Sequence, residues 1–196
     1  MADKSKKALA TVAGVLDPLL RKWAQRLAEK TPADSIFRSE LVEGAIGALK
    51  GLLESFSDSM PAFASVSVEK ITDFGDFFAG ALGKAEDGGK VAVDKWMDKF
   101  FVDAGERLKK AKDKTLEAQH IHQEFVLRLA ILDDIEAAVQ KRREQAHEKT
   151  GGEPKTEKPG FVEFWKKKAE PWLAEKDLEI AGGVEKWMNK QRWLRP

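Results

Sequence analysis

Apolar residues recur every three to four positions along most of the chain, the spacing that places them on one face of an α-helix. Pro and Gly residues divide this periodic pattern into segments of helical length. The pattern predicts an all-α protein, and the high content of Ala, Lys, Glu and Leu agrees with that class. The expected helices cover residues 4–16, 17–30, 31–56, 67–82, 90–104 and 106–149, followed by short helices in the C-terminal region.

The longest expected helix covers residues 106–149, because this stretch contains neither Gly nor Pro. Its middle, residues 125–132, is apolar nearly all round, which is typical of a buried helix. Its two ends, residues 109–114 and 140–149, are highly charged and should project into solvent. We therefore predict a helical bundle built around one long central helix.

Three glycines, Gly44, Gly47 and Gly51, lie inside the helix expected over 31–56. Each costs on the order of 1 kcal/mol relative to Ala in a helix interior. The expected reason for them is the close approach of another helix.

A stretch rich in Gly, Pro and charged residues, without any apolar residue, covers 151–160. Composition of this kind is typical of a linker. It divides the chain into a helical bundle core at 1–150 and a Trp-rich, basic helical tail at 161–196. The tail is too short to form a core of its own, so it must fold back on the bundle or dock on a partner. We expect the core to fold without it.

Three segments of seven residues share a branched apolar residue, a Lys, a Trp and a terminal base. On a helix the apolar residue and the Trp, three positions apart, lie on one face with basic side chains at its edge. Such a face packs in the core, which is the more frequent fate of Trp, or docks on a partner. We expect core packing for Trp23 and Trp96 and leave both interpretations open for Trp187. The three segments are residues 20–26, 93–99 and 184–190.

The tail supplies the predicted partner-binding surface. It contains four of the six Trp residues of the chain, and basic residues flank the last two. Aromatic residues with a cationic edge are frequent in protein interfaces. The predicted partner-binding residues are Trp165, Trp172, Lys186, Trp187, Met188, Lys190, Arg192, Trp193 and Leu194.

Clusters of basic residues suggest an alternative, contact with the phosphates of a nucleic acid. Acidic residues are interleaved in the same helices, and the formal net charge of the chain is only +1, so solvated helix faces explain the clusters better. Binding to a membrane surface is less favoured still, because acidic residues dilute the positive face of the tail. The candidate nucleic-acid contacts are Lys141, Arg142, Arg143, Lys166, Lys167 and Lys168.

Two Glu-x-x-His pairs, Glu117–His120 and Glu144–His147, match the pattern of di-iron helical bundles. In one straight helix they lie roughly 40 Å apart, so they cannot share a metal ion unless two subunits combine them. The chain has no Cys and no Tyr, and it lacks phosphate-binding loops, nucleophile elbows and zinc-protease motifs. We therefore expect no catalytic activity, no cofactor and no metal within one chain.

These observations predict a non-enzymatic helical adaptor or scaffold that docks within a larger protein assembly. No apolar run approaches the length of a bilayer span, and the N-terminal segment has no clear signal-peptide cleavage site. A cytoplasmic location is therefore expected. A homo-oligomer is also compatible with the sequence.

Overall fold

The computed structural model describes residues 17–27, 29, 38–59, 74–84, 86–151 and 160–175. Almost all of these residues are helical and none of them lies in a strand, which confirms the predicted all-α class. A first helix covers residues 17–27, and the helix expected over 4–16 lies outside the described residues. The helices that follow are α2 (Arg38–Ser59), α3 (Phe74–Lys84), α4 (Glu86–Lys110), α5 (Lys114–Thr150) and α6 (Phe161–Glu175).

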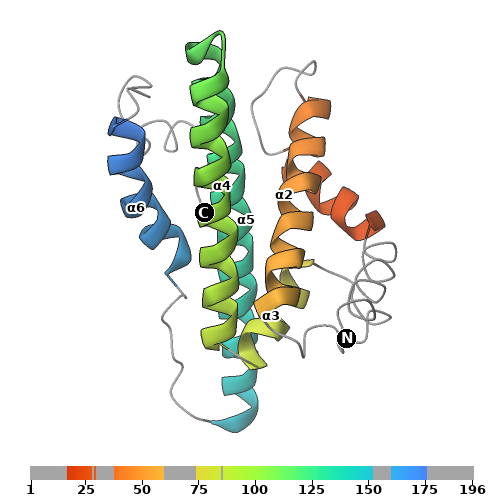
Figure 1. Cartoon of the computed structure of the whole chain (residues 1–196). Helices are drawn as coiled ribbons and strands as arrows, with labels where there is room; N and C mark the ends of the chain where they lie inside the picture. Colours follow the sequence, from red (N-terminus) through yellow and green to blue (C-terminus); the bar gives the residue numbers. More distant parts are fainter. Residues whose placement is uncertain are drawn as a thin grey trace, which may run out of the picture.

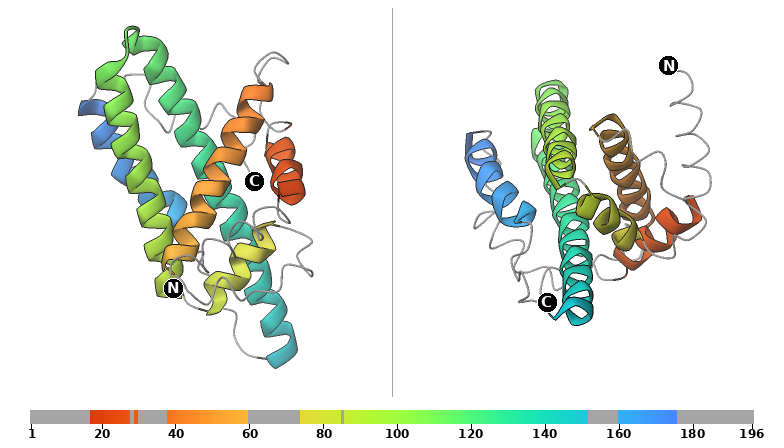
Figure 2. Two further views of the ribbon diagram at one scale, coloured as in Figure 1. Left: turned by 45° about the vertical axis from the view of Figure 1, so that its right-hand side comes forward. Right: turned by 90° about the horizontal axis from the view of Figure 1, so that it is seen from below.

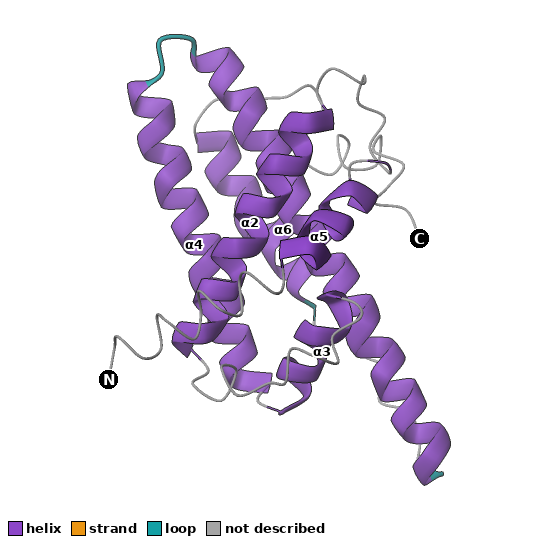
Figure 3. Ribbon diagram, turned by 90° about the vertical axis from the view of Figure 1, so that its right-hand side faces the viewer, coloured by secondary structure: helices purple, strands orange, loops and turns teal. Residues whose placement is uncertain are grey.

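Two antiparallel helices, α4 and α5, occupy the centre of the molecule (Figure 1). α2 lies along one flank of this pair and α6 along the other, and the view from below shows the same order (Figure 2). α3 packs across α5, and the helix over 17–27 lies on the side of α2. The last turns of α5 extend past the other helices (Figure 3), as the charge of residues 140–149 predicts.

The long helix begins later than the sequence pattern predicts. Instead of one helix over 106–149, α4 ends at Lys110 and α5 begins at Lys114. Asp113 has an extended backbone (φ −107°, ψ 98°), and its carboxylate accepts a hydrogen bond from the backbone N–H of Leu116 at 3.0 Å. An Asp in this N-cap position starts a new helix by satisfying an N–H that has no partner within the helix. The prediction of a single helix is therefore wrong at its start, and the central position of the remainder is confirmed.

The middle of α5 forms the centre of the core. Every residue from 125 to 132 except Arg128 is less than 5% exposed. Rings from the surrounding helices pack against one another and against α5: Phe56 and Phe78 have centroids 4.9 Å apart, and Phe100 stacks on Phe125 at 6.4 Å. Burial of these large apolar surfaces is the main stabilising contribution to such a bundle.

The glycines of α2 account for part of its packing. A Cβ atom at Gly51 would lie 3.5 Å from ring atoms of Trp96 on α4, which is already van der Waals contact. The expectation of close helix approach is therefore confirmed at this position. A Cβ atom at Gly47 would meet no other atom within 4 Å, so nothing in the structure explains why this position is a glycine.

The first part of the tail folds back onto the bundle. α6 begins beside α5, where the backbone N–H of Val162 donates a hydrogen bond to the buried carboxylate of Glu136 at 3.3 Å. A carboxylate acceptor at a helix N-terminus is favourable, because it meets both a free N–H and the positive end of the helix dipole. The linker at 152–159 and residues 176–196 lie outside the described residues, so the division into core and tail stays a prediction.

Candidate interaction surfaces

Two of the three Trp-Lys segments lie in the core. Trp23 is 1% exposed and Trp96 is 4% exposed, which confirms the core packing expected for both. The indole N–H of Trp23 also donates a hydrogen bond to Asp134 of α5 at 2.8 Å and so fixes the first helix to the central pair. The third segment lies outside the described residues, together with the predicted partner-binding residues Lys186, Trp187, Met188, Lys190, Arg192, Trp193 and Leu194.

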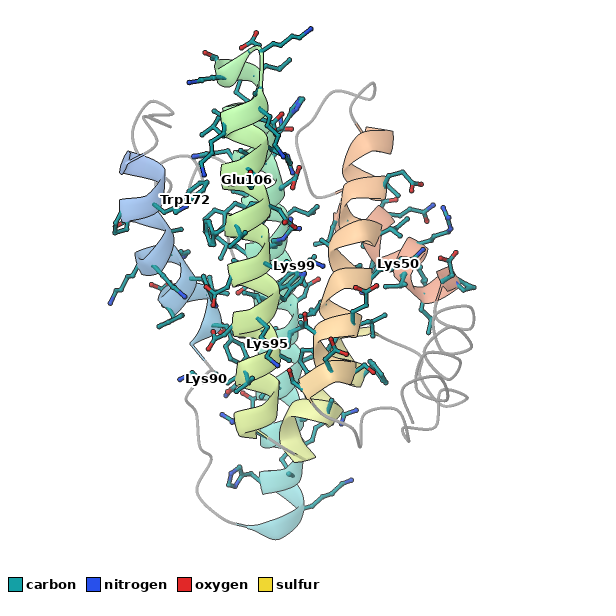
Figure 4. All side chains as sticks on the ribbon, in the orientation of Figure 1. Lys50, Lys90, Lys95, Lys99, Glu106 and Trp172 are labelled. Carbon is teal, nitrogen blue, oxygen red and sulfur yellow. The ribbon has the colours of Figure 1, made fainter. Side chains whose placement is uncertain are left out.

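Trp165 anchors α6 to the bundle. Its side chain is fully buried and stacks on Phe101 of α4, with ring centroids 5.9 Å apart and an interplanar angle of 17°. The ammonium group of Lys168 lies 4.1 Å from the centroid of the Trp165 ring, within the range of a cation–π interaction. Trp172 is half-buried and meets Phe101 edge-on at 5.1 Å (Figure 4). Trp165 therefore holds α6 in place and cannot touch a partner while α6 is packed.

Phe164 is an exposed aromatic residue that the sequence reasoning missed. Its side chain is 47% exposed and lies edge-on to Trp165, with ring centroids 5.5 Å apart. Lys167 is exposed three positions further along and forms no ion pair within the described residues. Adjacent helical residues point about 100° apart, so the two rings face different directions, and it is the contact of Trp165 with Phe101 that leaves Phe164 as the exposed one.

The lysines at 166, 167 and 168 do not form one patch. Lys166 pairs with Glu163 at 3.1 Å, and Lys168 pairs with Asp98 of α4 at 2.8 Å. Because consecutive side chains point in different directions on a helix, the three ammonium groups are dispersed around α6. Two of them are also neutralised by acidic neighbours.

The end of α5 that extends past the bundle carries a basic face. An open hollow of about 480 Å³ lies against it, and no acidic residue is among the described residues that line the hollow. Arg143, the third basic residue of the cluster at 141–143, is half-buried and does not line it. The lining residues are Lys141, Arg142, Gln145, Ala146 and Lys149.

A cluster of ion pairs joins α4 to α5 next to the turn between them. Arg107 donates through Nε to Oε1 of Glu117 at 2.7 Å and through Nη1 to Oε2 of Glu124 at 3.0 Å. Hydrogen bonding to Glu124, and then to Glu117, raises the pKa of Arg107 against the opposing effect of burial. Glu117 is thus bound to an arginine, and no group of three or more acidic or His side chains in the described residues is arranged to hold a metal ion.

Arg128 on α5 is a largely buried cation. Its guanidinium carbon lies 4.2 Å from the ring centroid of Phe100 and 5.5 Å from that of Trp96. Its Nη1 donates to the backbone carbonyl of Glu124 at 3.1 Å. Burial lowers the pKa of Arg128 to about 10, because the charged form loses hydration. The aromatic faces and the carbonyl replace part of that hydration, so this arginine serves the packing of α4 on α5.

Within the described residues, none of the helices combines the length and the apolar content needed to cross a bilayer. Comparison of the chain with protein-family models, with curated proteins and with solved structures found no match.

Proposed function

We propose that this protein is a non-enzymatic helical adaptor that docks a protein partner through the outward side of α6 and the Trp-containing segment beyond it. The observation that carries the proposal is Phe164. A large aromatic side chain that is 47% exposed on an otherwise anchored helix is the kind of residue that forms the centre of a protein interface.

The way in which α6 is held supports this role. Trp165 buries one side of the helix, and Glu136 receives its N-terminal N–H group. An anchored helix presents Phe164 and Lys167 in a fixed geometry, which reduces the entropy that binding would cost. The last Trp-Lys segment, at 184–190, extends the same combination of aromatic and basic side chains along the chain.

The test is capture from native extract by the full-length protein, with Phe164→Asp as the disrupting variant. Leu116→Asp is the matched control, because Leu116 is 50% exposed at the start of α5, away from α6. We expect wild type and Leu116→Asp to retain the same partner, identified by mass spectrometry, and Phe164→Asp to lose it. Equal capture by all three proteins would contradict the proposed surface.

A second candidate function, contact with nucleic-acid phosphates, is supported by the basic hollow at the end of α5, whose described lining residues include no acidic side chain. We favour the adaptor and expect no binding to DNA or RNA tighter than about 10 μM at physiological salt. Tighter binding that weakens steeply with salt and disappears in Lys141→Glu with Arg142→Glu would reverse the order of the two candidates. Loss of the captured partner after nuclease treatment would do the same.

A further inference from the structure

The outward face of α4 is a second unusual surface. α4 lies at the centre of the molecule between α2 and α6, and lysine side chains project from it along its length (Figure 4). Val91 and Val102 are 47% and 66% exposed on this helix and are two of the four large apolar side chains exposed in the described part of the chain. Covering these two valines would remove apolar surface from water, which is favourable.

Between residues 90 and 103, the exposed side chains of this face follow an order that is complementary to itself. From residue 90 to residue 103 the series is Lys, Val, Asp, Lys, Asp, Lys, Val, Asp. Read backwards, with the sign of every charge reversed, it gives the same series. All eight side chains are exposed except that of Asp94, which is partly exposed. In order they are Lys90, Val91, Asp94, Lys95, Asp98, Lys99, Val102 and Asp103.

This order fits a second α4 that runs antiparallel to the first, with a two-fold axis passing midway between positions 96 and 97. The face consists of two neighbouring rows of side chains, each with a spacing of four residues, and such rows are the ridges through which helices pack. The two-fold axis places the row formed by residues 90, 94, 98 and 102 of one copy against the row formed by residues 91, 95, 99 and 103 of the other copy. Across the axis, Lys90 meets Asp103, Val91 meets Val102, Asp94 meets Lys99, and Lys95 meets Asp98.

The charges of this face have few partners in the single chain. Within the described residues none of Lys90, Asp94, Lys95, Lys99 and Asp103 forms an ion pair within 4.0 Å, although each has an opposite charge three or four positions away. In addition, the middle of each ridge places two like charges four residues apart, an arrangement that disfavours an isolated helix. An antiparallel second copy would supply the opposite charge at every one of these positions.

Asp98 is the exception, because one of its oxygens accepts a bond from Lys168 of α6 at 2.8 Å. A carboxylate has two oxygens and accepts several hydrogen bonds, so this contact leaves Asp98 able to pair with Lys95 of a second copy. The bond also ties α6 to the edge of the same face.

We infer that this protein forms a homodimer through the outward faces of two antiparallel α4 helices. A two-fold interface requires a surface that is complementary to itself, and the order of charges and valines on α4 meets that requirement. A different protein would have no need of the symmetric order. A contact between two single helices is smaller than a standard interface, and its outer parts are charged, so the dimer is weak and sensitive to salt.

Charge reversal tests the pairing. Sedimentation velocity of the full-length protein from about 5 to about 500 μM should show reversible dimers at low salt that dissociate near 0.5 M salt. Lys99→Asp alone and Asp94→Lys alone place like charges together twice per dimer and should each weaken association at least about tenfold. An equimolar mixture of the two variants should restore it, because every Asp of one chain then faces a Lys of the other. Lys141→Asp, which makes the same charge change elsewhere, should dimerise as wild type does.

Disulfide trapping tests the register. The chain has no Cys, so introduced thiols are unambiguous. Under mild oxidation, a mixture of Val91→Cys and Val102→Cys proteins should give disulfide-linked dimers, whereas each variant alone should give few, because residue 91 meets residue 102 and not itself. Circular dichroism should show unchanged helix content, since both side chains are exposed.

Three results would overturn the inference. The first is a monomer up to about 500 μM at low salt. The second is a dimer that neither charge reversal affects, which would place the contact elsewhere on the molecule. The third is efficient self-linking of the Val91→Cys protein, which would require another register.

Discussion

At the scale of single residues, the side chain of Arg107 links α4 to α5. It lies in the last turn of α4 and forms hydrogen bonds with Glu117 and Glu124 of α5, across a turn that local periodicity does not predict. The turn requires the chain to leave the helix after Lys110. The N-cap hydrogen bond of Asp113, together with the Arg107 contacts, offsets the helical hydrogen bonds lost at the turn.

Arg107→Met should therefore destabilise the fold, because it removes the cation that pairs with Glu117 and leaves Glu124, within the described part of the chain, only its longer contact with Arg128, at 3.8 Å. We expect a loss of roughly 1–3 kcal/mol in the free energy of unfolding, measured by urea denaturation. Lys109→Met serves as the control, because Lys109 is 72% exposed and, among the described residues, pairs only with Glu106 of its own helix. Its effect should stay within about 0.5 kcal/mol. Equal effects of the two substitutions would show that the cluster contributes nothing beyond surface charge.

His122 makes stability depend on pH. It is 2% exposed, and burial lowers its pKa below the ordinary value of 6.5. The folded state therefore binds fewer protons than the unfolded state once the pH falls below 6.5, so stability is full above that pH and decreases below it.

The melting temperature of wild type should accordingly fall between about pH 7.5 and about pH 5.5, above the range in which carboxylates titrate. His122→Leu should remove most of this slope. His120→Ala changes an exposed histidine two residues away and should retain it. A slope that is identical in all three proteins would assign the pH dependence to other groups.

At the scale of elements, α6 is held to the bundle along its length, since Phe161, Trp165 and Ala169 are all buried. Phe101 of α4 contacts both Trp165 and Trp172, so one ring on the bundle receives both tryptophans of this helix. The lysine pair with Asp98 and the N–H bond to Glu136 add polar contacts at two further points. Packing thus extends along most of α6, although the linker before it lies outside the described residues.

If α6 and the bundle unfold together, Trp165→Ala should lower the free energy of unfolding by about 3–5 kcal/mol, the usual cost of truncating a buried aromatic residue to Ala. Phe164→Ala, at the next position but 47% exposed, should cost less than about 1 kcal/mol. The measurement is thermal or urea unfolding followed by circular dichroism. A small effect of Trp165→Ala, with an early loss of only part of the helical signal, would instead support a bundle that is stable without α6, which is the division predicted from the linker composition.

At the scale of the whole molecule, three outward surfaces differ in character. α6 offers an exposed aromatic ring, the end of α5 offers a basic face, and α4 offers an order of charges complementary to itself. A dimer through α4 would carry two copies of the α6 surface, and two linked sites raise the effective affinity for a partner that also has two. The proposed adaptor and the inferred dimer are nevertheless independent, because the variants that test them change different helices.

The sequence by itself determined the helical class and the identity of the central helix. Both follow from short-range periodicity: a stretch such as 125–132, apolar on all sides, must be buried wherever it lies. The burial of Trp23 and Trp96 follows in the same way from their positions on apolar stripes.

Only the tertiary structure decided where the long helix begins, which of two adjacent aromatic residues is buried, and which charges remain without partners. Residues around Asp113 are compatible with a continuous helix, and the chain turns there because α4 then packs on α5. Phe164 and Trp165 are both apolar, and their different burial depends on the side from which α6 meets Phe101. Contacts between residues distant in sequence decide these features, and a periodic pattern describes only the face of a helix and not its neighbour.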